Sequence, residues 1–170
     1  MGSIVVLTGP VGAGKTTVAR ELVKSAAAPT AFIEGDVFWS FIARAPAGRP
    51  RQRSFQTIMR AMFRSAAAFA ADDFEAILDF TMPPAFLERA AARVESTRVH
   101  LVILRPSEPV CAARAAARSE GVILDYGPYR DLYALFDGAE RHVIRNDAIS
   151  PTAAAAAIRE GLAAGTFRIG

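Results

Sequence analysis

The chain has 170 residues, of which 52% are hydrophobic and 22% charged, and this balance indicates a folded, soluble, globular protein. The length is typical of one domain, residues 1–170, and no apolar run reaches the roughly 18 residues that would predict a membrane span. The net charge of +3 suits a small anionic ligand and is too small and too dispersed to predict nucleic-acid binding.

The first predicted element is a short buried strand over Ile4 to Leu7, where apolar and β-branched residues follow one another. It leads directly into Gly9 to Thr16, whose sequence G-P-V-G-A-G-K-T matches the pattern G-x-x-x-x-G-K-[ST] in full. A helical pattern follows over Thr17 to Lys24. Because the motif follows a strand and opens a helix, we predict a loop that binds the phosphates of a nucleotide.

Each residue type in this loop has a physical task. Glycines allow positive φ angles, so that the backbone N–H groups can turn inward around an anion, and the helix that starts near Gly14 adds its positive end. Lys15 can reach the β- and γ-phosphates, and the Thr16 hydroxyl can hold Mg²⁺, whereas Thr17 is expected to start the helix. The predicted nucleotide-binding residues are Gly9, Pro10, Val11, Gly12, Ala13, Gly14, Lys15, Thr16 and Thr17.

Strands and helices alternate along the rest of the chain. A second short strand over Ala31 to Glu34 precedes the apolar residues Phe38 to Ala43, which could begin a helix, and Arg44 to Arg53 is expected to form a mobile basic loop. The remaining predicted elements are, in order, a helix over Ser54 to Ala71, a strand over Ala76 to Phe80, a helix over Ala85 to Val94, a strand over Val99 to Leu104, helices over Pro106 to Glu120 and Pro128 to Phe136, a strand over His142 to Arg145, and a helix from Ser150 to about Ala164. This alternation predicts a three-layer α/β domain around a parallel sheet.

The order of these motifs resembles that of the small P-loop kinases of the shikimate kinase, gluconate kinase and chloramphenicol phosphotransferase type. The resemblance covers nearly the whole chain. It rests on the loop Gly9 to Thr16, on Glu34-Gly35-Asp36, on Leu78-Asp79-Phe80, on Arg114 and Arg118, and on the helix that Ser150-Pro151 begins. It implies a three-layer α/β/α P-loop NTPase domain with a five-stranded sheet in the order 2-3-1-4-5, a small helical lid, and ATP with Mg²⁺.

Two departures leave the acceptor open. Shikimate kinases carry a glycine triplet after the third strand, where this chain has Asp79-Phe80-Thr81-Met82. Gluconate kinases show Leu-His where this chain has Val37-Phe38-Trp39. A sugar acid, an antibiotic hydroxyl and a nucleoside-like acceptor therefore all stay open.

Asp36 is the predicted base, because ligands of parallel sheets gather beyond the carboxyl ends of the strands and because it matches the acid of the similar kinases. The alternative is that Asp36 caps the next helix. Glu34 lies two residues earlier, so that along an extended chain both carboxylates would point to one side and Glu34 could support Mg²⁺. Asp79 resembles the acid that ends a Walker B strand; metal binding, binding of the substrate hydroxyl and turn capping stay open for it.

Arg114 and Arg118 are four residues apart in a predicted helix, and hence on one face of it. They match the lid arginines of the similar kinases, of which one could stack on adenine and the other contact the transferred phosphate. The alternative is a solvated helix face. Trp39 is expected to help wall the acceptor, unless it belongs to the core, and Arg60 could face the cleft and favour an anionic or carbohydrate-like acceptor.

The sequence as a whole predicts an ATP- and Mg²⁺-dependent kinase that phosphorylates a hydroxyl of a small molecule. Lys15, Asp36 and Arg118 are the expected catalytic residues; Asp36, Trp39, Arg60 and Asp79 the substrate residues; and Thr16, Glu34 and Asp79 the metal residues. Two alternatives stay open, namely a nucleotide-sugar kinase that resembles zeta toxins and a regulatory module that hydrolyses ATP slowly. We expect a cytoplasmic monomer or homodimer without nucleic-acid or membrane partners, and the sole cysteine, Cys111, excludes an intrachain disulfide.

Overall fold

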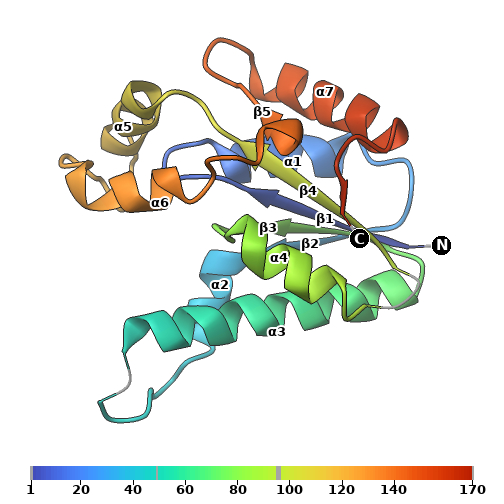
Figure 1. The fold of residues 1–170 in the computed structure, drawn as a ribbon, viewed down its shortest axis with the longest axis horizontal. Coiled ribbons are helices and arrows are strands. Elements are labelled where there is room, and N and C mark those ends of the chain that lie inside the picture. Colours follow the sequence, from blue (N-terminus) through green and yellow to red (C-terminus); the bar gives the residue numbers. More distant parts are fainter. Residues whose placement is uncertain (1, 49, 95–96, 170) are drawn as a thin grey trace.

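The computed structural model describes residues 2–48, 50–94 and 97–169, which form a sheet with helices on both faces (Figure 1). The strands are β1 (Ser3–Thr8), β2 (Thr30–Glu34), β3 (Glu75–Asp79), β4 (Arg98–Leu104), β5 (Val143–Ile144) and β6 (Arg168–Ile169). The first five pair in parallel in the order β2-β3-β1-β4-β5. The sheet order and strand direction predicted from the sequence are therefore confirmed.

The strand β6 was not predicted. It pairs antiparallel with β4, with Val99 opposite Ile169, whereas β5 pairs in parallel with Ile103 and Leu104 further along β4. Since β1 occupies the other edge of β4, the two short strands share one edge. An element of two residues is too short to produce a hydrophobic period, so the sequence pattern gave no signal for it.

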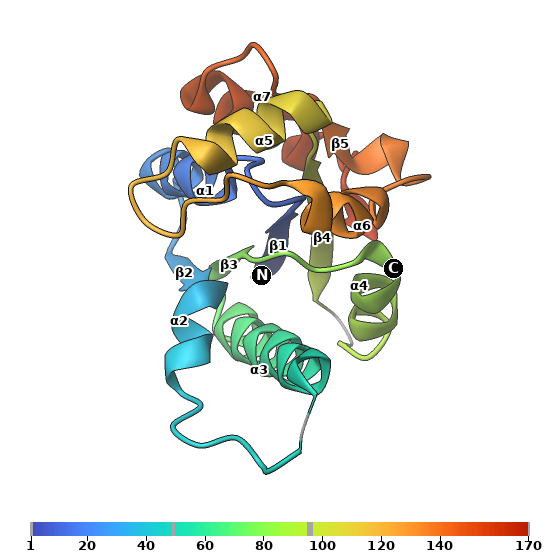
Figure 2. The same cartoon turned by 90° about the vertical axis from the view of Figure 1, so that its left-hand side faces the viewer.

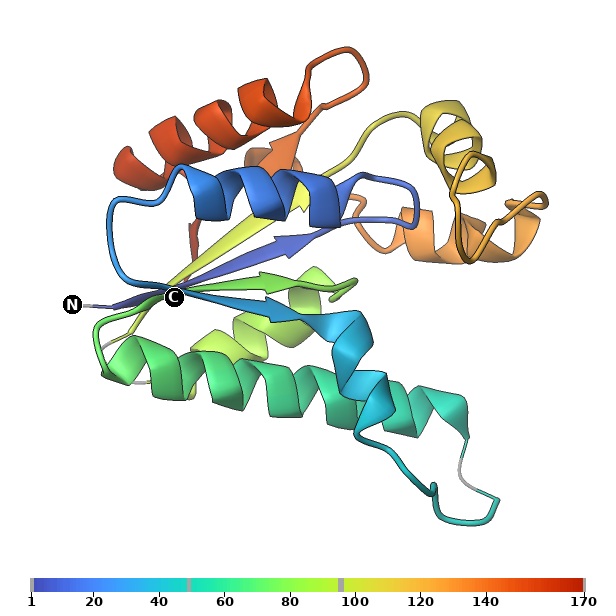
Figure 3. The ribbon, with the colours of Figure 1, turned by 180° about the vertical axis from the view of Figure 1, so that it is seen from behind.

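The helices cover the sheet on both faces. They are α1 (Lys15–Lys24), α2 (Gly35–Ser40), α3 (Arg51–Ala71), α4 (Pro84–Ala91), α5 (Glu108–Ala116), α6 (Arg130–Ala134) and α7 (Pro151–Ala163), with 3-10 turns η1 (Gly127–Tyr129) and η2 (Glu140–His142). Helices α1 and α7 lie on one face, and α3 and α4 lie on the other (Figure 3). Within the described ranges, no helix combines the length and apolarity that crossing a membrane requires.

Alternation along β1 explains why its sequence is apolar without interruption. Ile4 and Val6 belong to the core under α3 and α4, whereas Val5 and Leu7 belong to the core under α1 and α7. Successive side chains of a strand point to opposite faces, so a strand covered on both sides buries every residue. Both cores thereby fix the end of β1, from which the phosphate loop starts.

Several helices differ from their predicted bounds, and three of them differ most. The helix expected over Pro106 to Glu120 ends at Ala116, the one expected from Phe38 begins at Gly35 and ends at Ser40, and that over Pro128 to Phe136 is divided into η1 and α6. The basic segment ends earlier than expected, because α3 begins at Arg51; its residue Arg49 lies outside the described residues. The cap at Ser150 is confirmed, since its side chain accepts a hydrogen bond from the Ala153 N–H.

Helix α5 is short because the chain turns back on it. The N–H of Ile123 donates to the carbonyl of Ala115 at 3.1 Å, and Gly121 supplies the positive φ of 62° that the turn needs. Ile123 then packs on a buried cluster of Cys111, Ala115 and Tyr126. This apolar contact is long-range in the sequence, and it overrides the helix propensity of residues 117–120.

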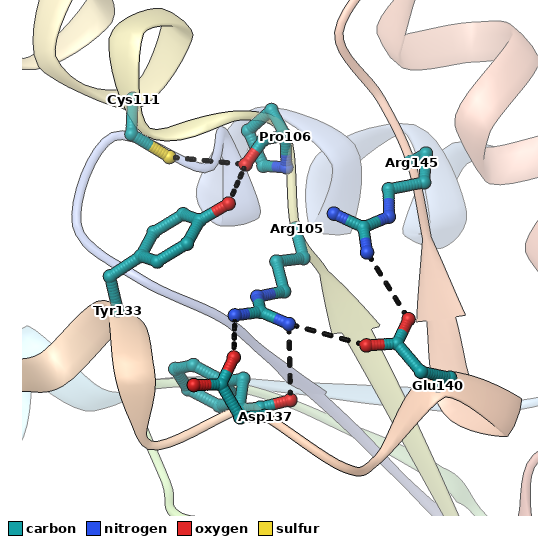
Figure 4. A network of polar contacts seen from close by, with 8 residues as sticks. Arg105, Pro106, Cys111, Tyr133, Asp137, Glu140 and Arg145 are labelled. Carbon is teal, nitrogen blue, oxygen red and sulfur yellow. Dashed lines mark hydrogen bonds and ion pairs between the residues drawn. The ribbon is translucent and has the colours of Figure 1, made fainter.

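The end of β4 is tied to the α6 region through Arg105 (Figure 4). Its guanidinium is buried, with a side chain only 7% exposed, and it donates to the carboxylates of Asp137 and Glu140 and to the Phe136 carbonyl. The ring of Tyr133 lies 4.7 Å from the guanidinium carbon. A planar guanidinium can make ionic and aromatic contacts at the same time, so Arg105 fixes the α6 region to the end of β4.

We expect Arg105→Met to destabilise the fold by about 1–2 kcal/mol, a discounted value because Asp137 and Glu140 are 68% and 60% exposed and stay hydrated. Hydrogen exchange should accelerate over residues 126–142, and urea unfolding gives the stability. Arg145→Met is the control, because Arg145 is 54% exposed and contacts Glu140 at 3.2 Å from the surface. Equal losses in the two variants would contradict a special role for the buried guanidinium.

Candidate active site

A cavity of about 1790 Å³ opens at the carboxyl ends of β1, β2 and β3. Helices α2 and α3 bound it on one side, and the segment from α5 to α6 bounds it on the other (Figure 2). Of the residues predicted from the sequence, those that line it are Val11, Gly12, Gly14, Lys15, Thr16, Thr17, Glu34, Asp36, Trp39, Asp79, Arg114 and Arg118. The structure thus brings together residues from four separate segments of the chain.

Four predicted residues do not line this cavity. Gly9, Pro10 and Ala13 belong to the phosphate loop without lining the cavity. Arg60 is exposed on α3, where it donates to the Thr57 hydroxyl at 3.3 Å. The residues of α3 that line the cavity lie between Arg51 and Met59, in the first half of the helix, and Arg60 is not among them, so the expectation that Arg60 faces the cleft is not met in this structure.

The phosphate loop is held by side chains from distant parts of the sequence. Three of its carbonyls accept such hydrogen bonds: Gly9 from the Thr81 hydroxyl at 3.1 Å, Val11 from the Tyr126 hydroxyl at 2.7 Å, and Ala13 from the Asn146 amide at 2.8 Å. A loop whose carbonyls are already bonded keeps its shape before a ligand arrives, which lowers the entropic cost of binding. Sequence reasoning missed all three donors.

Gly12 lies against the backbone of α5. Its φ is +82°, and a Cβ there would be 2.1 Å from the carbonyl oxygen of Cys111. The Cys111 side chain is buried, and burial raises the pKa of its thiol. Gly12 is therefore required by the close approach of two backbones as well as by the loop conformation.

We expect Gly12→Ala to destabilise the protein by at least about 1–3 kcal/mol and to weaken nucleotide binding, because the methyl group must push α5 away from the loop. Gly165→Ala is the matched control, since Gly165 also has a positive φ, 73°, but no atom within 4 Å of an added Cβ. Urea unfolding measures both. Similar losses in the two variants would mean that the backbone angle alone is responsible.

Lys15, Thr16 and Asp79 meet where β1 and β3 end. The Thr16 hydroxyl donates to Asp79 Oδ2 at 2.5 Å, and the Lys15 amine donates to the carbonyls of Gly9 and Pro10 at 3.2 and 3.1 Å. Burial raises the pKa of Asp79, although Lys15 and the Thr16 hydrogen bond oppose the rise. Burial lowers the pKa of Lys15, which Asp79 partly offsets. The charged forms of both groups are disfavoured by burial, and each would be stabilised by a further group of opposite charge.

Asp36 and Glu34 reach the same cavity by a route that differs from the predicted one. Glu34 ends β2 directly opposite Asp79, whereas Asp36 lies in the first turn of α2, so the two are not alternate residues of one extended strand. The strand ends at Glu34, and the helix begins at Gly35. Only glycine fits at position 35, because a Cβ there would lie 2.2 Å from the Phe80 ring. Asp36 is exposed to the cavity, and its charge, like that of Asp79, raises the pKa of Lys15.

Arg114 and Arg118 do not share a helix face, contrary to the prediction, because α5 ends between them. Arg114 donates to the carbonyls of Asn146 and Asp147 at 2.9 and 3.3 Å, and so connects α5 to the loop after β5. Arg118 lies beyond the helix and is near enough to Lys15 to lower its pKa. The two guanidinium groups nevertheless line one cavity, each held by a different segment.

Several lining residues were not recognised as site residues from the sequence. Helix α3 contributes Arg51, Gln52, Phe55, Gln56 and Met59, the loop after β5 contributes Asn146 and Ile149, and α7 contributes Pro151. A weak signal existed for α3, because Gln52 and Gln56 lie one turn apart and interrupt its apolar stripe. The loop after β5 has no such pattern.

Comparison with known proteins was informative at the level of family and fold. A family model described as an AAA domain matches residues 4–122, and no curated protein matches the chain. Similar solved structures include a Deinococcus radiodurans tunicamycin resistance protein (15% identity, 100% of this chain and 99% of that one, TM-score 0.73), a sugar kinase from Janibacter sp. HTCC2649 (19%, 96% and 95%, 0.72) and a gluconokinase from Sinorhizobium meliloti 1021 (20%, 96% and 97%, 0.59). At these identities the likeness establishes a P-loop kinase-like fold, as the resemblance noted in the sequence implied.

Proposed function

We propose that this chain, which belongs to the AAA domain family of P-loop proteins, is an ATP- and Mg²⁺-dependent kinase that phosphorylates a hydroxyl of a small molecule. One observation carries the proposal. The cavity that holds Lys15 and the Thr16–Asp79 pair also holds Asp36, a carboxylate that phosphate binding does not require. A hydrolytic switch needs no such group, whereas a kinase needs a base for the acceptor hydroxyl.

The nucleotide would occupy the half of the cavity between α1 and α7. Its phosphates would lie on the loop and the start of α1, and the Lys15 amine would exchange the carbonyls of Gly9 and Pro10 for phosphate oxygens. Arg114, Ile149 and Pro151 line the same end of the cavity and offer flat or apolar contacts for a base. Arg118, which lines the cavity and lies near Lys15, would neutralise the transferred phosphate.

The residues present fit a magnesium ion. Asp79 is 4% exposed and has a pKa that burial raises, so it is a costly charge that a cation would stabilise. A magnesium ion is commonly held by one or two protein groups together with phosphate oxygens. Thr16 and Asp79 would hold the ion and Glu34 would support it; the bound ion would neutralise phosphate charge.

Asp36 would act on the acceptor. Its side chain is exposed to the cavity beyond the end of β2, where a carboxylate can accept the proton of a hydroxyl and orient its oxygen toward the phosphate. Asp79 is less suited to this task, because it already accepts the Thr16 hydrogen bond and is buried. We therefore assign the base to Asp36 and the metal to Asp79.

We expect Asp79→Asn to raise the melting temperature of the nucleotide-free protein and to remove the Mg²⁺ dependence of ATP binding. Since burial raises the Asp79 pKa, the native state holds its proton to higher pH than the unfolded chain, and stability falls as pH rises through that raised value. The asparagine variant should lack this fall. Calorimetric melting at several pH values measures it, and a melting temperature below that of the wild type would contradict the assignment.

The proposal is tested by ADP release from ATP and Mg²⁺ with and without a panel of hydroxyl compounds. A kinase shows release that depends on one class of acceptor, together with a phosphorylated product in the mass spectrum. Turnover that is indifferent to every acceptor would favour the regulatory module, and failure to bind any nucleotide would reject both readings. Nucleotide-sugar acceptors belong in the panel, because they distinguish a zeta-toxin-like enzyme from other kinases.

A further inference from the structure

The part of the cavity beyond Asp36 has a continuous aromatic wall. Trp39 and Phe55 have ring centroids 6.5 Å apart, and Phe55 and Phe80 are 5.0 Å apart with an interplanar angle of 30°. All three line the cavity, and Trp39 and Phe55 are only partly buried. Rings that are packed against one another and in part exposed to the cavity form a rigid apolar surface for a flat apolar group.

The segment from α5 to α6, here called the lid, also lines this cavity with apolar residues. Between α5 and α6 the chain contributes Val122 and Ile123, and α6 with its C-cap contributes Leu132 and Leu135. Val122 is 50% exposed and Leu135 is 44% exposed, so both present apolar surface that a ligand in the cavity could cover. The figures place α5 and α6 on one side and α2 and α3 on the other (Figures 2 and 3), so apolar surfaces bound the cavity from both sides.

The charges in this part do not suit an acidic acceptor. Glu34 and Asp36 are both carboxylates, and a third carboxylate placed between them and the rings would be repelled. Among the described residues, Arg51 is the one basic side chain that α3 contributes to the cavity, and its guanidinium already lies 5.1 Å over the Trp39 ring. The sequence-based expectation of an anionic or carbohydrate-like acceptor depended on Arg60, which does not line the cavity.

We propose that the acceptor is an uncharged compound that carries a flat apolar ring next to the hydroxyl that is phosphorylated. This inference rests on the proposed function and names its substrate class. The ring packs between the Trp39–Phe55–Phe80 wall and the apolar residues of the lid, and Gln52 and Gln56 supply neutral hydrogen-bonding groups beside it. The hydroxyl projects toward Asp36. An open-chain sugar acid would bury no ring and would bring its carboxylate toward Glu34 and Asp36.

Binding of three probes tests the inference without ATP or Mg²⁺. Phenyl β-glucoside has a ring and hydroxyls, glucose has hydroxyls alone, and gluconate adds a carboxylate. Trp39 is the single tryptophan of the chain, so its fluorescence reports on this subsite directly. Burying a phenyl ring predicts that the phenyl glucoside binds about 10- to 100-fold more tightly than glucose, and gluconate is expected to bind most weakly. Gluconate binding as tightly as the phenyl glucoside, or no detectable binding of the phenyl glucoside, would overturn the proposal.

A pair of variants separates the wall from general effects. In calorimetry, Trp39→Ala is expected to weaken phenyl glucoside binding about tenfold and to leave glucose binding unchanged. Phe41→Ala is the matched control, because Phe41 is 69% exposed, packs on Phe38 and does not line the cavity. Circular dichroism confirms that both variants fold. Equal losses in both variants would overturn the assignment of the wall.

The kinase activity and the acceptor class can be tested separately. ATP binding is measured on the same protein preparation without any acceptor. Loss of the ring preference with intact, acceptor-dependent phosphoryl transfer would overturn the acceptor class and keep the kinase. Ring binding without any affinity for ATP would reject the kinase.

Discussion

Replacing Asp36 by asparagine is expected to lower acceptor-dependent ADP release by about 10²- to 10⁴-fold, the range that removal of a general base typically produces. Asparagine has the same shape but cannot accept the proton of the acceptor hydroxyl. Asp36 lies in the first turn of α2 and is exposed to the cavity, so the change should leave the fold intact. The affinity for ATP should stay within a few fold, because the phosphate loop lies on other elements. Steady-state kinetics with the acceptor varied measures the effect on kcat.

The matched control is Asp72→Asn. Asp72 is the C-cap residue of α3. It lies at the opposite end of this helix from Arg51, which lines the cavity. Its substitution removes the same charge from the protein without changing the site. If Asp36→Asn kept wild-type turnover, Asp36 would not be the base; the alternative that it caps the helix does not hold in this structure, where Glu34 is the N-cap residue of α2.

Lys15→Met is expected to lower kcat/KM for ATP by about 10²- to 10³-fold, since it removes a cation placed at the charge that develops during phosphoryl transfer. Methionine keeps the length of the side chain and removes the ammonium group. The chain has one other lysine, Lys24, which is 71% exposed and pairs with Glu21 at 2.7 Å. Lys24→Met is therefore a close control, and it should leave turnover unchanged.

The pH dependence of ATP binding gives a second test of Lys15. Burial lowers the pKa of its amine below the ordinary value of 10.5, and phosphate binding should raise it again. Binding at alkaline pH should therefore take up a proton, and affinity should fall as pH rises through the lowered pKa, before an ordinary lysine would lose its charge. Calorimetry in buffers of different ionisation enthalpy counts this proton. Uptake that persists in Lys15→Met would assign the titration to another group.

Local patterns were sufficient where the chemistry is carried by consecutive residues. The loop Gly9 to Thr16 could be predicted from the sequence, because positive φ angles, an anion nest and a helix start all require particular residues at fixed spacing. Strands β1, β3 and β4 were found because burial on both faces produces apolar runs. The sequence could not place Arg60 or Arg118, since the face of a helix that meets a cavity and the residue at which the helix stops depend on what packs against it.

The sequence by itself determined the phosphate loop, the alternation of strands and helices, and the acids at the ends of β2 and β3. Only the tertiary structure decided that Thr81, Tyr126 and Asn146 hold the loop, and that Trp39, Phe55 and Phe80 form one wall. The physical reason is the range of the forces. Backbone conformation is set by neighbours along the chain, whereas hydrogen bonds and ring contacts between residues far apart in sequence exist only after the sheet has brought its strand ends together.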